Sequence, residues 1–213
     1  MTNTTEWYTI LIMLNNSHYP KTNDVIIRKA LIRKLLEEDH SNDPETVVVE
    51  ELGLRHGTVR VDVALVNGRL HGFELKSDLD TLLRLPRQMQ VYNLVLDRIT
   101  LVVGKNHVHE AINIIPDWWG VLIAKSIDLA GHIKFYEIRQ PEDNPSLDSR
   151  SIAKLLWRDE ALDILEQLGH ASGIRSKRRD VIYERLISVL SQEELKAKVR
   201  RSLSTRINWR VAK

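Results

Sequence analysis

The stretch TVRVDVALVNGRLHGFELKS, residues 58–77, decides the fold of this 213-residue chain. Its two halves are rich in β-branched and other apolar residues, which predicts strands at 58–66 and 69–77. Asn67-Gly68 between them is the pair most typical of a tight hairpin turn. We therefore expect a β-hairpin here, with a further strand before it at 47–54.

Helices are expected on both sides of these strands. Apolar residues recur at helical spacing from 24 to 38, behind a capping pair at Asn23-Asp24. A second helix is expected at about 80–96, where Pro86 predicts either a kink or a helical start. The uniformly apolar run 99–104 is typical of a strand buried on both faces. The predicted order of helix, three strands, helix and strand indicates an α/β fold with a mixed sheet. A short helix and two strands should follow, at 107–114, 119–125 and 132–138.

A change of composition near residue 140 divides the chain. Residues 141–150 have the Pro, Asp, Asn and Ser content of a linker, and the chain after them has helical spacing. We therefore expect a core at 1–140 and a basic helical region at 151–213. Residues 1–148 carry 16 Lys and Arg against 21 Asp and Glu, whereas residues 149–213 carry 15 against 8. A basic tail behind an acidic body suggests a polyanionic partner, with a solvated helical surface as the alternative.

The composition also excludes some classes of protein. The chain has no cysteine, so it can form neither disulfides nor a thiolate metal site, which fits a reducing cytoplasm. The longest apolar run near the start, Ile10 to Leu14, is too short for a signal peptide or a membrane span. No GxxxxGK[ST] motif occurs, so an NTPase is not expected. We expect a cytoplasmic protein with no membrane association.

The second strand of the hairpin combines apolar and charged residues. Because side chains alternate along a strand, Glu74 and Lys76 should share one face while Phe73 and Leu75 point into the core. Burial of the apolar pair forces the charged pair onto the other face of the sheet. This triplet is the first sign of a functional site.

The turn decides whether Asp62 joins this charged face. A two-residue turn would place Asp62 on the face opposite to Glu74. A three-residue turn that pairs Leu65 with Arg69, and needs a left-handed Gly68, would place both acids on the same face. We expect the second register, because it gathers the charged side chains.

Two carboxylates on one face suggest a cation between them. Asp62 and Glu74 offer the oxygen ligands that Mg²⁺ or Mn²⁺ prefers. Lys76 beside them would orient or activate a water and stabilise charge on a phosphate. Gly72, expected opposite Asp62, would leave room for a substrate backbone. A surface Asp and an exposed Glu/Lys pair remain the simpler interpretation of the spacing alone.

Three further features favour a site over that simpler interpretation. The strand before the hairpin offers a third acid, Glu51 or its neighbour Glu50. Gln88 and Tyr92 lie four residues apart and therefore on one helix face. Finally, their helix follows directly after the strand that carries the charged triplet.

These residues resemble the PD-(D/E)XK nuclease superfamily, whose core is helix, three strands, helix, strand. Asp62 matches its motif aspartate, Glu74-Leu75-Lys76 matches its (D/E)XK, and Gln88 to Tyr92 resembles the QxxxY element of RecB-like members. The chain also looks like an uncharacterised bacterial and phage family within that superfamily, over nearly its whole length. One departure is the opening helix, whose only candidate acids are Glu37 and Glu38 at its far end.

The resemblance implies a restriction-endonuclease-like mixed sheet core (αβββαβ) and Mg²⁺-dependent hydrolysis of phosphodiester bonds in DNA, with RNA left open. Asp62 and Glu74 would hold Mg²⁺ or Mn²⁺, with Glu51 as a third ligand. Lys76 would act on the water, while Gln88 and Tyr92 would support Lys76 or the scissile phosphate. Roles in repair or in mobile-element defence follow by resemblance alone. The alternative is a non-catalytic nucleic-acid-binding protein with an inactive nuclease fold, and a third option is a protein-interaction module.

The C-terminal helical region offers the best candidates for phosphate contacts. They form a dense basic cluster of Arg175, Lys177, Arg178 and Arg179. The surrounding helices faintly resemble the SAP-type DNA-binding module, with a helical bundle packed on the core as the alternative. The oligomeric state is left open, with a homodimer as one option.

Overall fold

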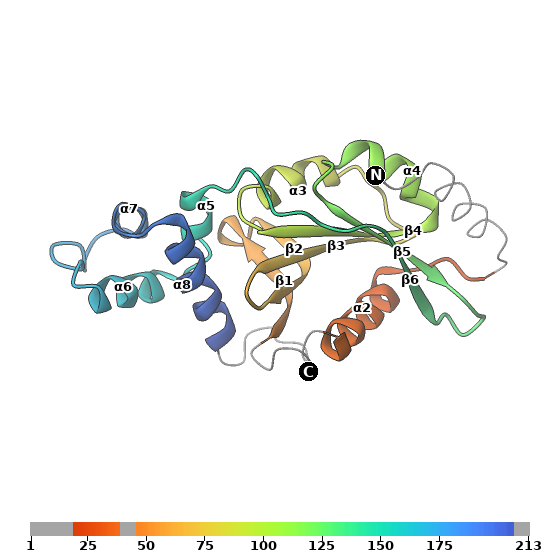
Figure 1. The fold of residues 1–213 in the computed structure, drawn as a ribbon, viewed down its shortest axis with the longest axis horizontal. Helices are drawn as coiled ribbons and strands as arrows, with labels where there is room; N and C mark the ends of the chain where they lie inside the picture. Colours follow the sequence, from red (N-terminus) through yellow and green to blue (C-terminus); the bar gives the residue numbers. More distant parts are fainter. Residues whose placement is uncertain (1–18, 39–45, 207–213) are drawn as a thin grey trace.

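The computed structural model describes residues 19–38 and 46–206, and it is a mixed α/β structure (Figure 1). The first elements in chain order are α2 (Asp24–Glu38), β1 (Val47–Leu54), the short 3-10 turn η1 (Arg55–Gly57), β2 (Val59–Val66), β3 (Leu70–Lys76), α3 (Leu85–Tyr92) and β4 (Arg98–Gly104). They are followed by η2 (Lys105–His107), α4 (Val108–Ile114), β5 (Gly120–Ser126) and β6 (Ile133–Arg139). The C-terminal helices are α5 (Ser149–Ala153), α6 (Arg158–Gln167), α7 (Arg179–Val189) and α8 (Gln192–Thr205).

The six strands form one sheet in the order β1-β2-β3-β4-β5-β6. The β1–β2, β2–β3 and β5–β6 pairs are antiparallel, whereas β3–β4 and β4–β5 are parallel. The predicted mixed sheet and the C-terminal helices are therefore confirmed. The predicted order of helix, three strands, helix and strand is the order from α2 to β4.

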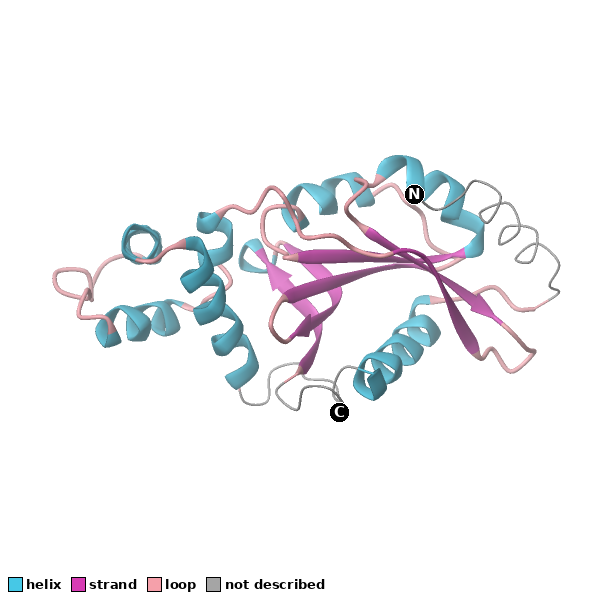
Figure 2. Cartoon of the chain, viewed as in Figure 1, coloured by secondary structure: helices cyan, strands magenta, loops and turns pink. Residues whose placement is uncertain are grey.

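Apolar layers cover both faces of the sheet. Helix α2 buries Ile27, Leu31 and Leu35 on one face, where they pack against Phe73 and Leu75 of β3. Helices α3 and α4 cover the other face, as Figure 2 shows. Alternate residues of β3 thus point into different layers, as the strand periodicity predicts.

Local sequence signals explain where the two helices of the core begin. The Asn23 side-chain oxygen accepts a hydrogen bond from the backbone N–H of Ile26 at 3.0 Å, which caps α2 as predicted. Pro86 lies in the first turn of α3, where a missing N–H costs nothing. Pro86 therefore marks a helical start rather than a kink, and residues 77–84 form turns instead of helix.

The hairpin between β2 and β3 differs from its predicted register. Val66 pairs with Leu70 and Leu65 pairs with His71, so the predicted pairing of Leu65 with Arg69 is wrong. Gly68 does not take a left-handed φ. The side-chain oxygen of Asn67 instead accepts the backbone N–H of Arg69 at 3.0 Å and closes the turn. The observed partner of Leu65 lies two residues further along β3 than predicted. Because side chains alternate with a period of two, each side chain still lies on the predicted face of the sheet.

Gly72 also has a different role from the one predicted. It lies opposite Ala64, not opposite Asp62. A Cβ atom at Gly72 would lie 2.5 Å from Leu96 Cδ1 and 3.2 Å from Val61 Cγ2. The missing side chain therefore lets Leu96, which follows α3, pack closely on the sheet and does not make room for a substrate.

The C-terminal helices pack against the sheet region through a shared apolar core. Buried residues of α5 to α8 belong to the same cluster as those on the α3 face of the sheet. The segment at 141–150 is tied to the core, since Asn144 Nδ2 donates to the carbonyls of Asn93 and Leu96 at 2.9 and 2.8 Å. Lys196 of α8 forms a salt bridge of 2.8 Å with the buried Asp97. Among the described residues, no helix is long and apolar enough to cross a membrane.

Candidate functional site

The β2–β3 pair is closed at one end and open at the other. Backbone pairing ends with Val63 opposite Phe73. The next residue of β2 is Asp62, whose Oδ2 accepts the backbone N–H of Leu75 at 2.8 Å. A side chain thus replaces the backbone partner at this point, and the two strands separate beyond it. We refer to residues 59–62 and 74–76 as the open end, and to residues 63–66 and 70–73 as the closed end.

Strand β1 is distorted beside the same position. Glu50 pairs with Val63 and Leu52 with Val61, so Glu51 lies opposite Asp62. Glu51 has a φ of 51°, in the left-handed region that non-glycine residues rarely adopt. Within β1 this strain falls on the residue that faces Asp62, and Arg55 and His56 of η1 are left-handed as well, with φ of 48° and 57°.

The strands change faces at this distortion. Ala64 and Val66 of β2 point into the α3 layer, but beyond Asp62 it is Val61 and Val59 that do so. Consequently the β1–β2 hairpin curls away from the rest of the sheet, as Figure 2 shows. This curl opens a cleft of about 660 Å³ beside the open end.

The cleft brings together most of the predicted site residues. Its lining includes Glu51, Asp62, Glu74, Lys76 and Gln88. It also includes charged residues that the sequence patterns did not single out, namely Asp24, Arg28, Arg60, Asp80, Arg84 and Arg87. The site therefore combines five strands and helices: α2, β1, β2, β3 and α3.

Arg28 of α2 connects the acids on one side of the cleft. Its Nη2 lies 3.0 Å from Asp62 Oδ1, and its Nη1 donates to the Asp62 carbonyl at 2.8 Å. The same guanidinium contacts Glu51 Oε1 at 2.9 Å and Asp24 Oδ2 at 3.2 Å. Burial acts to lower the pKa of Arg28, but the three carboxylates outweigh it and raise that pKa. Arg28 is thus a permanent positive charge among these acids.

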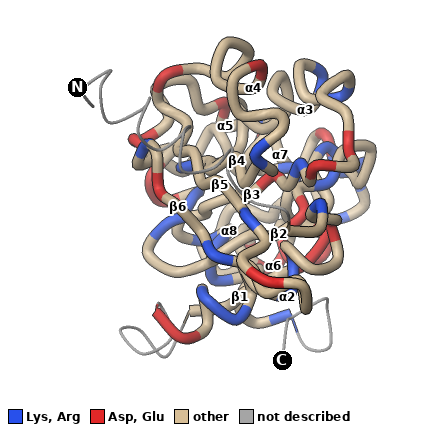
Figure 3. Tube along the Cα trace, turned by 90° about the vertical axis from the view of Figure 1, so that its right-hand side faces the viewer, with Lys and Arg blue, Asp and Glu red and all other residues tan. Residues whose placement is uncertain are grey.

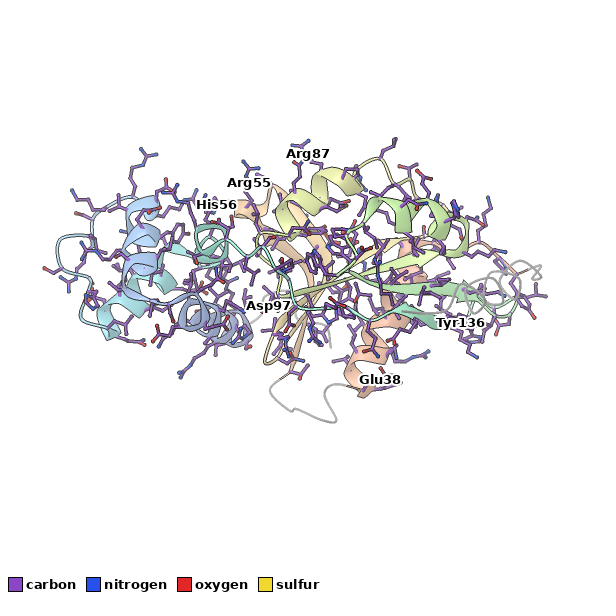
Figure 4. The ribbon with its side chains drawn as sticks, turned by 45° about the horizontal axis from the view of Figure 1, so that its top comes forward. Glu38, Arg55, His56, Arg87, Asp97 and Tyr136 are labelled. Carbon is purple, nitrogen blue, oxygen red and sulfur yellow. The ribbon has the colours of Figure 1, made fainter. Side chains whose placement is uncertain are left out.

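The acid that the opening helix brings to the cleft is Asp24. Glu37 and Glu38, the expected candidates, lie at the other end of α2, and Glu38 lines a groove beside Leu35 and His71. Figure 4 shows Glu38 at the far end of its helix from the labelled Arg55 and Arg87. The sequence contains one indication that Asp24 belongs to a site: its i,i+4 spacing from Arg28 places both side chains on one helix face.

Glu74 and Lys76 form a buried ion pair at the bottom of the cleft. Their side chains are only 1% and 4% exposed. Lys76 Nζ also lies 3.3 Å from Gln88 Oε1, and the Tyr92 hydroxyl lies 2.5 Å from Glu74 Oε2. Gln88 Nε2 donates to the Tyr92 oxygen at 3.3 Å, which closes a ring of four side chains. Burial raises the pKa of Tyr92, so it stays a neutral hydrogen-bond donor.

Asp62 has a strongly perturbed environment. Burial and the neighbouring Glu74 carboxylate raise the pKa of Asp62 to about 7. The Leu75 N–H, Arg28 and Lys76 oppose that shift without cancelling it. A carboxyl group that titrates near neutral pH is typical of functional sites, although ion-pair networks can also produce one.

The carboxylates fit a hard cation with few protein ligands. Among the described residues, no group of three or more His, Cys, Asp or Glu is arranged to hold a metal ion. Mg²⁺, however, is commonly bound by one or two carboxylates, with waters and substrate phosphates completing its shell. Asp62 and Glu74 match that donor set, since they directly follow the last backbone pair of β2 and β3 and line the same cleft. Glu51, the predicted third ligand, is engaged by Arg28.

The predicted basic cluster lies on the C-terminal helices, apart from the cleft lining. Arg175, Lys177, Arg178 and Arg179 are exposed, at the turn before α7 and at its start. Arg175 is paired with Glu166 through contacts of 2.6 and 2.8 Å. Figure 3 shows acidic and basic positions interspersed along the described chain.

The cleft and the C-terminal helices meet at η1. Gly57 of η1 lines the cleft, while its neighbour His56 stacks on Tyr183 of α7, with ring centroids 6.2 Å apart. Burial and the nearby positive charges of Arg179 and Lys154 lower the pKa of His56. The start of α7 is therefore the part of the basic cluster nearest to the cleft.

Comparisons with known proteins identify relatives of the chain. Protein cII of Enterobacteria phage P4 is 26% identical over 143 residues, which cover 67% of this chain and 53% of that protein. The match thus spans about half the length of this curated relative. A solved structure of a protein of unknown function from Silicibacter pomeroyi is 22% identical, with a TM-score of 0.40, and covers 72% of this chain and 94% of that one. The family model described as bacteriophage P4 protein cII matches residues 18–210. Because this match includes nearly the whole chain, the protein belongs to the bacteriophage P4 protein cII family.

Proposed function

We propose that this protein is a metal-dependent phosphodiesterase that acts on DNA and has a restriction-endonuclease-like core of the PD-(D/E)XK type. The observation that carries the proposal is the open end of the β2–β3 pair. There Asp62, Glu74 and Lys76 line one cleft, with Gln88 from α3 beside them. The order of elements from α2 to β4 supports the proposed fold.

The energetics of the open end favour a function over a purely structural role. A buried ion pair such as Glu74–Lys76 is often less stabilising than apolar residues of similar volume. Asp62 takes the place of a backbone partner, and Glu51 beside it is strained. Several destabilising features in one place are expected where residues are retained for their chemistry and not for stability.

Each residue of the cleft has a role in the proposed reaction. Asp62 and Glu74 would hold Mg²⁺ or Mn²⁺, which when bound supplies a Lewis acid for the phosphate and a more acidic water. Lys76 places a positive charge at Nζ for the phosphate or the attacking water. Gln88 fixes the position of that ammonium group, and Tyr92 fixes the Glu74 carboxylate. The phage origin of the family favours a role in mobile-element biology over general repair.

The direct test is hydrolysis of single-stranded, duplex and branched DNA in the presence of Mg²⁺ or Mn²⁺. We expect wild type to cut at least one of these forms, and Glu74→Gln to cut none. Asp128→Asn is a matched control, because Asp128 is an acid in the exposed turn after β5. If wild type and Glu74→Gln cut equally well, the activity lies elsewhere.

A second candidate function is nucleic-acid binding without catalysis. The specific observation in its favour is that each of Glu51, Asp62 and Glu74 already forms an ion pair, with Arg28 or Lys76. Such a protein would bind DNA with a salt dependence that metal does not change. Replacing Arg175, Lys177, Arg178 and Arg179 with Ala should then reduce the slope of log affinity against log salt by ~0.9 for each lost phosphate contact.

A further inference from the structure

Two leucines are exposed beside the cleft. The loop at 77–84 joins β3 to α3, and its Leu79 and Leu83 are 63% and 87% exposed. Leu82 of the loop and Leu85, the first residue of α3, are buried at 5% and 0%. The loop and the start of α3 therefore place two leucines in the core and present two others to solvent.

The loop is held in this conformation by its own acids. Asp78 accepts hydrogen bonds from the backbone N–H of Thr22 at 2.9 Å and from that of Asn106 at 3.0 Å. Asp80 accepts the backbone N–H of Ser77 at 2.7 Å. These hydrogen bonds hold the first half of the loop, and burial of Leu82 and Leu85 anchors the second half, so the fold itself keeps Leu79 and Leu83 exposed. Neither side chain gains the stabilisation that burial of a leucine provides.

Arginines flank these leucines. Arg84 follows Leu83 directly, Arg87 lies one turn further on, and both line the cleft. Neither forms a salt bridge within residues 19–38 and 46–206, unlike Arg28 in the same cleft. Figure 4 shows Arg87 and Arg55 projecting outward along one edge of the molecule. The exposed leucines thus adjoin positive charge that has no protein partner in the described structure.

From this juxtaposition we infer that Leu79 and Leu83 contact the unstacked bases of a bound DNA strand, while Arg84 and Arg87 hold its phosphates. The inference rests on the proposed function and adds the form of the substrate, a strand whose bases are accessible. Apolar side chains inserted between bases are a known means of unstacking nucleic acid. Arginine supplies the phosphate contacts that position the strand.

A second copy of this chain fits the patch less well than a nucleic acid does. A two-fold interface would bring the same surface together from both copies. Arg84 and Arg87 of one copy would then face those of the other, and like charges across an interface oppose association. A polyanion with apolar bases satisfies both the arginines and the leucines.

The test uses a short single-stranded DNA that contains 2-aminopurine, whose fluorescence rises when its base unstacks, in EDTA to prevent cleavage. Wild type should bind it with a rise in fluorescence. Leu79→Ser with Leu83→Ser should bind roughly tenfold more weakly and give no rise, since loss of about 1.4 kcal/mol is tenfold in affinity. Leu129→Ser is the matched control, because Leu129 is 83% exposed in the β5–β6 turn and should behave as wild type.

Three other outcomes would overturn the inference, and each would remove a different part of it. Tight binding with no fluorescence rise in wild type would overturn the base contact and leave the proposed hydrolysis intact. Failure of wild type to bind or to cut any DNA form would overturn both. A wild-type dimer in sedimentation that dissociates in the double leucine variant would assign the patch to a second copy.

Discussion

The closed and open ends of the β2–β3 pair are made from the same two strands but behave differently. At the closed end, Val63 and Phe73 face each other across a regular backbone ladder. At the open end, the Asp62 carboxylate takes the backbone N–H of Leu75, and Glu74 and Lys76 pair with each other. The chemistry of a few side chains therefore decides where a continuous sheet ends and a cleft begins. Stability should depend on the closed end, and activity on the open end.

The largest expected effect is the loss of hydrolysis when the charged pair is replaced. Glu74→Leu with Lys76→Met removes both charges from the buried site, so neither is left without a partner. We expect activity on DNA to fall by at least about 1000-fold, because one charged group in a site can contribute that much. The free energy of unfolding should stay the same or rise by about 1–4 kcal/mol. Cleavage assays and denaturant titration of the same preparation check both parts.

The closed end should show the opposite pattern. Phe73→Ala removes a buried aromatic side chain that is only 4% exposed and packs under α2. Its free energy of unfolding should fall by about 3–5 kcal/mol. The rate of DNA cleavage per folded molecule should change little, since Phe73 points away from the cleft. A loss of activity as large as that of the open-end variant, in protein that is still folded, would show that the two ends are not separate.

The closed end should also govern part of the pH dependence of stability. Burial, together with the positive charge of Arg98, lowers the pKa of His71 to about 3, and its Nε2 lies 2.8 Å from Thr100 Oγ1. His71 is thus neutral in the folded state, whereas in the unfolded state it gains a proton below a pH of about 6.5. Its contribution is fully present above that pH and is lost as pH falls toward 3. Between pH 6.5 and 5, wild type should lose up to about 2 kcal/mol relative to His71→Gln. Equal pH profiles for the two proteins in thermal unfolding would contradict this.

The smallest expected effect concerns the strain beside Asp62. Glu51→Gly and Glu51→Gln both remove the contact with Arg28, but only glycine relieves the left-handed φ of 51°. The glycine variant should therefore be more stable than the glutamine variant by about 1 kcal/mol. Urea denaturation of the pair measures the difference directly. A glutamine variant that is the more stable of the two would show that Glu51 is not strained.

The sequence predicts the elements of the sheet better than their detailed pairing. Alternation in Phe73 to Lys76 and the helical spacing after Asn23 were sufficient, because each reflects a local periodicity. Local sequence patterns were not sufficient to predict the hairpin register, because Asn67 closes the turn with its side chain in place of a left-handed Gly68. Arg28 was missed because two of its partners, Glu51 and Asp62, are distant in sequence and meet it only in the folded chain. The exposure of Leu79 and Leu83 likewise depends on tertiary hydrogen bonds to the loop.

The central claim is that the carboxylates at the open end hold a divalent metal ion, and calorimetric titration with Mn²⁺ tests it most directly. Wild type should bind the ion and gain thermal stability by mass action. Asp62→Asn should lose both the heat of binding and the stabilisation, while Asp128→Asn should keep them. An identical titration and an identical thermal shift for wild type and Asp62→Asn would contradict the account.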